Sequence, residues 1–451
     1  MVRTSRAITI GAIVALLVGV VAFGSGWIAA RAVGTTPIDT FLAGLGSQGA
    51  RQQTPADTRA EFAVFWQVWD LVQAEFYHEA PLNRQELVYG AIRGMLGALG
   101  DEYTTFQVPD VAAQSRESMQ GTFEGIGAYL AIRDGEIIID RPFKRSPAAE
   151  AGLLTGDVLV AVDGAALAPL IAGLDDGEAT AKAATLIRGP KGTVVRLTIR
   201  RPPAAESFEL PITRDEVPII TVNAELLADG VAYIQITEFK ATTTQLLDAA
   251  IRELAPQRPR RIVLDLRNNP GGFLTTSQEV LGRFYEGVAL YEQENGGVFK
   301  ELRTIAAPAD ARLFDLPMVV LINGGSASAA EIVAGALRDS RPNTSLLGEQ
   351  SFGKGSVQNI HQLSDGSSAR ITIARWFTPN RDEIHRVGID PQYDVVASEE
   401  PQFSVPCVVE RKPPEGRSTC SDAQLAWGLR LLDGETPPPA PISDAPHLER
   451  A

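Results

Sequence analysis

The chain has 451 residues, 45% of them hydrophobic and 21% charged, and its formal net charge is −14. A chain of this length is expected to form two to four globular domains. The acidic balance argues against a protein that binds nucleic acid, because phosphate binding requires basic patches. With only two cysteines and four histidines, zinc ribbons and histidine-rich centres are not expected, and we predict neither a metal nor another cofactor.

The N-terminus carries an apolar segment, because residues 7–30 contain no charged side chain. These 24 residues would form about 36 Å of helix, enough to cross a bilayer core of ~30 Å. We therefore expect a membrane-spanning signal anchor over residues 1–33, with a signal peptide cleaved near Ala30 as the alternative. Arg3 and Arg6 precede the span. Their charge predicts that the bulk of the chain lies outside the cytoplasm, in the cell envelope and anchored in the cytoplasmic membrane.

An N-terminal helical module is expected next. Residues 34–56 lack periodicity and are predicted to be a linker, whereas residues 57–117 show helical spacing. Two helices are expected, the second ending at Gly100 as its C-terminal cap. The first carries an aromatic stripe of Phe62, Phe65, Trp66, Trp69 and Phe76. This stripe suits a core or a self-association surface, and we predict a homodimer through this module.

Residues 118–205 indicate a β-rich module, because short apolar runs alternate with turn residues. Asp134-Gly135 lies between two such runs and is typical of a hairpin. Ser146-Pro147 predicts the start of a short helix that Gly152 ends. A second helix is expected at Glu178–Ile187.

Residues 206–398 alternate apolar strands with helices, the pattern of an α/β core in which helices cover a β-sheet. The strands and helices are expected at Val231–Ile236, Thr243–Leu254, Arg261–Leu266, Met318–Ile322 and Ala329–Leu337.

The C-terminal segment, residues 399–451, contains both cysteines. Cys407 and Cys420 form either one disulfide, which an oxidising compartment would favour, or two free thiols. Beyond Asp433 the chain is proline-rich and is predicted to be disordered.

Two segments of the α/β region place small residues at a strand end. The strand at 261–266 is followed by Asn269-Pro270-Gly271-Gly272, where paired glycines either expose backbone N–H groups to an oxyanion or make a simple tight turn. After the strand at 318–322, Ser328 lies at the expected start of a helix, three residues before Glu331. This pair is a capping box, and the small neighbours also leave the serine hydroxyl accessible as a nucleophile.

A third segment, residues 348–356, comes close to an ATP-binding P-loop. Gly355 stands where a P-loop requires Ser or Thr, and the following residues predict a strand instead of a helix. We therefore reject the P-loop. Lys354 then becomes the candidate general base, because burial can lower the pKa of a lysine and serine with neutral lysine is a known catalytic pair.

Together these motifs resemble the C-terminal processing (tail-specific) serine peptidases over about residues 60–395. The resemblance rests on Asn269-Pro270-Gly271-Gly272, Ser326-Ala327-Ser328 and Phe352-Gly353-Lys354-Gly355, while Phe123–Gly127 and Ser146–Leu153 are similar to segments of a PDZ domain. It implies an α/β protease core with an inserted or preceding PDZ-like domain. It also implies a serine endopeptidase that cleaves proteins in or near the C-terminal tail through an acyl-enzyme, with exposed C-termini as its substrates.

The same resemblance assigns the site residues. Ser328 corresponds to the nucleophile, Lys354 to the general base and Gln358 to the residue that orients the lysine. The oxyanion hole corresponds to the N–H groups of Gly271 or Gly272 and of Ala329. The loop Gly125-Ile126-Gly127 would bind the terminal carboxylate of the substrate. Arg188 would report occupancy of the PDZ-like domain to the core, and its alternative is a solvated turn arginine.

Three positions depart from the family pattern. Ala330 stands where a further serine is usual, Gln392 stands where aspartate is common, and the expected loop Arg338–Ser345 is one residue longer. The rival hypothesis is a catalytically inactive PDZ scaffold. Exchange of Ser328 or Lys354 would have indicated such a scaffold, and both residues are present.

Overall fold

The computed structural model describes residues 56–438, apart from 79–80, 144–145, 410–412 and 415. The chain divides after Arg84 into two compact units. The described helix of the first unit is α3 (Ala56–Glu75). None of the described helices is long and apolar enough to span a bilayer, and the expected anchor at 7–30 lies outside the described residues.

A six-stranded mixed sheet forms the centre of the second unit, in the order β10-β11-β12-β15-β16-β19. β10 runs antiparallel to β11, and every other neighbouring pair is parallel. The bounds are Val222–Leu226 for β10, Val231–Ile236 for β11, Arg261–Asp265 for β12, Met318–Ile322 for β15, Thr344–Gly348 for β16 and Tyr393–Asp394 for β19. The three predicted strands are confirmed, although β12 ends one residue earlier than expected.

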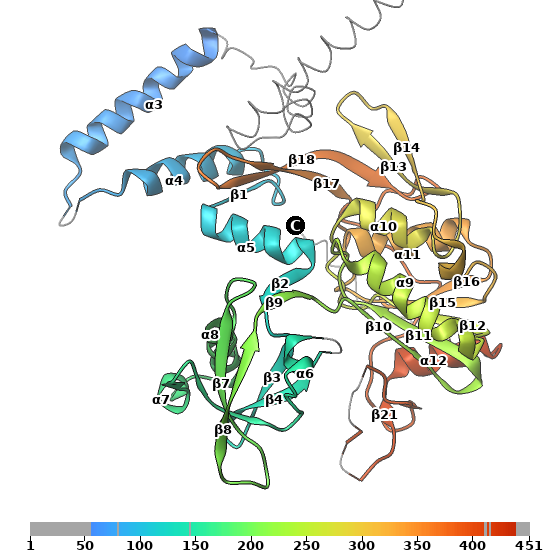
Figure 1. Cartoon of the computed structure of the whole chain (residues 1–451). Coiled ribbons are helices and arrows are strands. Elements are labelled where there is room, and N and C mark those ends of the chain that lie inside the picture. The colour runs from blue at the N-terminus through green and yellow to red at the C-terminus, as the bar shows by residue number, and fades with distance from the viewer. Residues whose placement is uncertain (1–55, 79–80, 144–145, 410–412, 415, 439–451) are drawn as a thin grey trace, which may run out of the picture. The chain divides into compact units, whose positions relative to one another are not determined.

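Helices cover both faces of this sheet because alternate strand residues point to opposite sides. Ile234, Leu264 and Val320 pack with residues of α9, α10 and α11 in one core, whereas Val263 and Val319 pack with α12 in another. Figure 1 shows α9, α10 and α11 clustered and α12 apart from them. The bounds are Thr243–Leu254 for α9, Leu274–Leu281 for α10, Ala329–Ser340 for α11 and Ala423–Leu432 for α12. Of these, α10 and α12 were not predicted.

The prediction of a loop at Arg338–Ser345 is wrong. Helix α11 continues to Ser340 and β16 begins at Thr344, so the connection is only residues 341–343. Helix α11 extends this far with its polar side chains paired, since Arg338 binds Asp339 at 2.7 Å and also contacts Asp382.

A second sheet is antiparallel, with the order β1-β18-β13-β14 and with β17 paired to β18. The bounds are Thr105–Gln107 for β1, Val288–Glu294 for β13, Phe299–Arg303 for β14, Ser356–Gln362 for β17 and Ser368–Phe377 for β18. Because β17 begins at Ser356, two residues after Lys354, no helix begins there, which confirms the rejection of the P-loop.

Helices α4 (Arg84–Gly97) and α5 (Pro109–Gln120) flank β1 in the chain. Helix α4 ends at Gly97, three residues before the predicted cap, and a tight turn follows in which the Gly100 N–H donates to the Gly97 carbonyl. Gly100 ends this turn with φ 68°, the left-handed conformation expected of a C-terminal glycine. The described residues also form 3-10 turns at Ala228–Gly230, Ala255–Gln257 and Ala309–Ala311.

The β-rich module has the strand order β3-β4-β5-β7-β8, with β6 beside β5. The strands are β3 (Ala128–Arg133), β4 (Glu136–Pro142), β5 (Val158–Val162), β6 (Ala165–Ala166), β7 (Val194–Arg200) and β8 (Ser207–Thr213), and the helices are α6 (Pro147–Glu150), α7 (Ala168–Ile171) and α8 (Asp176–Ile187). Asp134 and Gly135 both have positive φ, which confirms the predicted hairpin. A ribbon of β2 (Thr122–Gly125) and β9 (Asp215–Pro218) adjoins the module.

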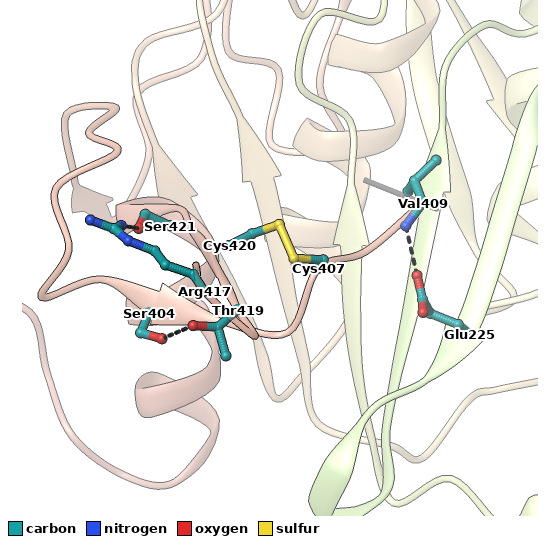
Figure 2. The surroundings of a disulfide bond; sticks show 8 residues. All are labelled: Glu225, Ser404, Cys407, Val409, Arg417, Thr419, Cys420 and Ser421. Atoms are coloured by element: carbon teal, nitrogen blue, oxygen red, sulfur yellow. Dashed lines mark hydrogen bonds between the residues drawn. A yellow bond between two sulfur atoms is a disulfide. The ribbon is translucent and has the colours of Figure 1, made fainter. Parts of the chain in front are cut away.

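The C-terminal segment contains α12 and, packed beside it, the short strands β20 (Ser404–Val405) and β21 (Cys420–Ser421). Cys407 and Cys420 form a disulfide, so the first of the two alternatives for the cysteines is confirmed. Figure 2 shows this bond together with the hydrogen bond from the Val409 N–H to Glu225 of β10.

Candidate active site

Ser328 lies at the N-terminus of α11, half-buried, with φ 55° and ψ −115°. A positive φ is uncommon for a residue that carries a Cβ, and such strain is typical of functional turns. The Ser328 N–H donates to Glu331 Oε2 at 2.7 Å, so the carboxylate half of the predicted capping box is present. The helix dipole therefore favours negative charge that develops beside this serine.

The glycine turn, residues 269–272, lies directly against the nucleophile loop, residues 323–328. A Cβ on Gly271 would lie 2.8 Å from Ser328 Cβ and 2.9 Å from the Ala329 nitrogen, so only glycine permits this approach. The Gly271 N–H donates to Asn269 Oδ1 at 2.9 Å. Within the described part of the chain, the N–H groups of Gly272 and Ala329 have no acceptor. These two donors are therefore available to an oxyanion beside Ser328.

Hydrogen bonds interlock the two loops. The Ala327 N–H donates to the Asn269 carbonyl at 2.9 Å, and Ser326 Oγ donates to the Leu266 carbonyl at 2.8 Å. Asn323 Oδ1 accepts from the Asn268 N–H at 2.9 Å. The turn and the nucleophile loop therefore hold each other in place before any substrate binds.

Glu331 joins the nucleophile loop to the lysine loop, which is the connection of residues 349–355 between β16 and β17. Its fully buried carboxylate accepts hydrogen bonds from the Ser328 N–H, from Ser351 Oγ at 2.6 Å, from the Gly353 N–H at 2.6 Å and from the Lys354 N–H at 2.9 Å. Burial raises the pKa of Glu331, and these four hydrogen bonds act in the opposite direction.

The sequence prediction treated Glu331 only as a cap and missed this connection. A local signal existed, because Glu331 stands among Ala329, Ala330, Ile332 and Val333, all buried. A carboxylate within such an apolar run must have polar partners elsewhere in the chain.

Lys354 is half-buried, and its Nζ lies 5.0 Å from the centre of the Tyr103 ring. Burial lowers the pKa of Lys354, and the charge of Arg370 lowers it further, whereas Glu331 and Asp101 raise it. The net direction, downward, is the one that a lysine needs to act as a base. Tyr103, which the sequence analysis missed, has no local signal because its contact with Lys354 crosses 251 residues of the chain.

Gln358 lies on β17, four residues after Lys354. Its amide nitrogen donates to Ser356 Oγ at 2.6 Å and to Thr372 Oγ1 at 3.5 Å. These bonds lead to its own strand and to β18, so an orienting effect of Gln358 on Lys354 stays a prediction.

The predicted carboxylate-binding loop Gly125-Ile126-Gly127 is buried, and it connects the end of β2 to the start of β3. Gly127 has φ 75°, and a Cβ there would lie 2.6 Å from Ser146 Cβ. The guanidinium of Arg188, at the end of α8, lies 4.9 Å from the centre of the Phe123 ring. Strand β3 is at the edge of its sheet, so it can accept an added peptide strand.

The described residues contain no group of three or more His, Cys, Asp or Glu side chains that could hold a metal ion. The groups that the structure brings together at this site are a serine, a lysine, a carboxylate and backbone N–H donors.

This fold and these motifs define a serine peptidase that carries a PDZ domain. The model of peptidase family S41 matches residues 230–395 and the PDZ domain model matches residues 138–201. The chain belongs to this family, among the carboxy-terminal processing proteases.

Two relatives and one solved structure illustrate the similarity. The carboxy-terminal processing proteases CtpA and CtpB of Bacillus subtilis (strain 168) are both 35% identical to this chain, over 83% and 77% of it and over 76% and 69% of their own lengths. The structure of the photosystem II D1 C-terminal processing protease is 30% identical, with 73% of this chain and 86% of that chain covered and a TM-score of 0.41.

Proposed function

We propose that this peptidase cleaves proteins in or near their C-terminal tails with Ser328 as nucleophile and Lys354 as general base. One observation supports the assignment above all others. The buried Glu331 carboxylate binds the backbone of both residues, at 2.7 Å and 2.9 Å, while Gly271 lies against the Ser328 side chain.

In this mechanism neutral Lys354 takes the proton from Ser328 Oγ as that oxygen attacks a peptide carbonyl. The oxyanion is stabilised by the N–H groups of Ala329 and of Gly271 or Gly272; Gly272 is favoured because the Gly271 N–H already has an acceptor. Protonated Lys354 then donates to the leaving amine, and water hydrolyses the acyl-enzyme. Gln358 is assigned to orient Lys354.

The test compares wild type, Ser328→Ala and Lys354→Ala on one unfolded protein, with its C-terminus either free or extended by a charged tail. We expect only wild type to cleave and the free-tailed form to be cleaved faster. Activity retained by Lys354→Ala would overturn the assigned base. Absence of any cleavage by the wild-type chain would favour the inactive PDZ scaffold.

The PDZ domain is proposed to bind the free carboxylate of the substrate at Gly125-Ile126-Gly127 while the peptide adds to the edge of β3. The exposed Arg188, stacked on Phe123 beside this loop, is proposed to report occupancy to the protease core. Titration with a labelled peptide tests this, because amidation of its C-terminus should weaken binding at least tenfold. Equal affinity for both peptides would exclude carboxylate binding.

We further propose that residues 1–33 anchor the chain in the cytoplasmic membrane with the peptidase outside the cytoplasm. The Cys407–Cys420 disulfide supports an oxidising compartment. The exposed Phe62, Trp66 and Leu71 on α3 support self-association into a homodimer. Membrane fractionation and the light-scattering mass of the full chain in detergent, with Trp66→Ser as the variant, test these two proposals.

A further inference from the structure

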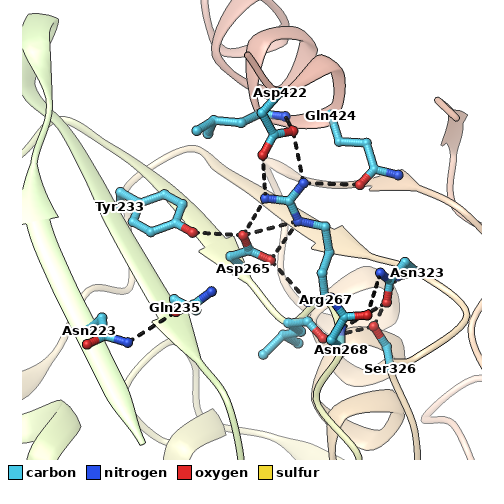
Figure 3. A network of polar contacts seen from close by, with 12 residues as sticks. Asn223, Tyr233, Gln235, Asp265, Arg267, Asn268, Asn323, Ser326, Asp422 and Gln424 are labelled. Carbon is cyan, nitrogen blue, oxygen red and sulfur yellow. Dashed lines mark hydrogen bonds and ion pairs between the residues drawn. The ribbon is translucent and has the colours of Figure 1, made fainter. Parts of the chain in front are cut away.

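The C-terminal segment supplies an acidic residue to the base of the glycine turn. Arg267 connects β12 to the turn, and its guanidinium lies between two carboxylates (Figure 3). Asp265 binds it at 2.6 Å and Asp422 at 2.9 Å, and Gln424 Oε1 accepts a further hydrogen bond at 3.1 Å. All three ionic side chains are largely buried, with 15% or less of each exposed. Asp422 and Gln424 lie beyond residue 395, where the match to the peptidase family ends.

The position of the Arg267 backbone affects the oxyanion donors, because it is followed directly by Asn268, Asn269 and the glycines. A cavity of about 390 Å³ lies between this strand end and the C-terminal segment, with Arg267, Asn268 and Asp422 in its lining. Most of the side chains that line it are polar. The polar bridge from Arg267 to Asp422 crosses to the C-terminal segment here.

The C-terminal segment is itself fixed close to this bridge. Cys420 precedes Asp422 by two residues and is bonded to Cys407. The Val409 N–H donates to Glu225 Oε1 on β10 at 2.7 Å (Figure 2). Asp422 is also the N-cap of α12, because its carboxylate accepts the Leu425 N–H at 2.9 Å.

We propose that Asp422 is a positioning residue for peptide cleavage: through Arg267 it holds the glycine turn, and the Cys407–Cys420 disulfide holds Asp422. This inference rests on the proposed function, since the turn matters for turnover only if it serves as the oxyanion hole. Asp422 itself does not touch the reacting atoms.

The experiment uses Asp422→Asn, because asparagine caps a helix as well as aspartate does, so Oδ1 can still accept the Leu425 N–H. The change removes the charge that faces Arg267 and replaces Oδ2, which accepts from the guanidinium at 2.9 Å, by an N–H₂ group. Asp433→Asn is the matched control. Asp433 lies at the other end of the same helix and contacts Arg261 at the start of β12, far from the turn along that strand. Cleavage of a fluorogenic peptide gives kcat and KM. Amide hydrogen exchange of residues 266–273 gives a second readout that does not require activity.

For Asp422→Asn we expect kcat to fall about tenfold with KM within twofold, because small displacements of positioned groups act on the transition state. Exchange in residues 266–273 should become faster, and Asp433→Asn should match wild type in both readouts. Restoration of most of the kcat by Asp422→Glu would support the role of the charge. Equal kcat and equal exchange in Asp422→Asn and Asp433→Asn would overturn the proposal.

The doubly substituted Cys407→Ser, Cys420→Ser chain tests the second part. We expect its kcat to fall in the same direction, and an unchanged kcat would overturn the role of the disulfide. If wild type cleaves nothing, the proposed function fails instead, and the exchange measurement alone decides whether Asp422 holds the turn.

Discussion

The nucleophile loop and the lysine loop meet at Glu331, but the structure fixes them to different degrees. Around Ser328, backbone hydrogen bonds, the contact with Gly271 and the buried helix α11 determine the position of the nucleophile. Around Lys354, only the backbone is bound to Glu331. The lysine side chain lies over Tyr103, and the Gln358 amide nitrogen is bonded elsewhere.

In the proposed mechanism, this difference means that backbone contacts position the nucleophile Ser328 and supply the oxyanion donors, whereas the base is the side chain of Lys354. Backbone elements are preorganised and need no rearrangement when charge develops. A lysine with four side-chain torsions depends instead on its neighbours for both its position and its protonation state. Substitutions around Ser328 and substitutions around Lys354 should therefore differ in the size of their effect on kcat and in the pH dependence of that effect.

The largest effect is expected from Ser328→Ala and Lys354→Ala, because nucleophile and base act as one unit. Each should lower kcat by about 10⁴-fold or more, and the double variant should lose little beyond either single one. Steady-state cleavage of a peptide, with circular dichroism to verify folding, measures both. Additive losses would show that the two side chains act independently and would contradict the dyad.

The next largest effect is expected from Glu331→Gln. The amide removes the buried charge and turns an N–H₂ group toward donors, so at least one of the four hydrogen bonds is lost at a cost of about 1–3 kcal/mol. We expect kcat/KM to fall about 10²-fold and the melting temperature to fall by several degrees. Glu349→Gln is the control, because Glu349 lies two residues before Ser351 and accepts an exposed hydrogen bond from the Ala397 N–H. Similar kinetics for both variants would refute the joining role of Glu331.

The sequence predicted the elements whose pattern is local. Met318–Ile322 is buried at every position, so a continuous apolar run indicated a strand covered on both faces. Of the antiparallel sheet, only the strand after Lys354 was predicted, because β17 and β18 are largely half-buried or exposed and give no continuous apolar run. Helix α12 follows a disulfide segment and packs against β15, so its place depends on contacts more than 100 residues apart.

The site divides in the same way. Ser328, Lys354 and the glycine turn lie in short motifs of small residues, which a single sequence displays. Glu331, Tyr103 and Asp422 act through contacts between distant segments. Local spacing can show that a buried Glu331 needs polar partners, but it does not identify them, and only the folded chain brings these residues together.

A smaller effect is expected from Gln358→Ala, because its amide nitrogen hydrogen-bonds to Ser356 and Thr372. If Gln358 orients the lysine during turnover, kcat should fall about tenfold. Ser356→Ala, which removes the partner but keeps the amide, should fall less. Equal losses in kcat would show that Gln358 only braces its own strand.

The smallest effect concerns the pH dependence. In the proposed mechanism Lys354 acts in its neutral form, so kcat/KM should rise with pH through the pKa of this group. Arg370 lowers that pKa, whereas Asp101 raises it. Arg370→Gln should therefore raise the pKa of Lys354 and move the acid limb of the kcat/KM profile to higher pH. We expect kcat/KM to fall a few-fold at neutral pH and to be unchanged on the alkaline plateau. Asp101→Asn should move the limb to lower pH. Because both variants remove one charge near Lys354, shifts of the same sign, or no shift in either, would show that another group controls the limb.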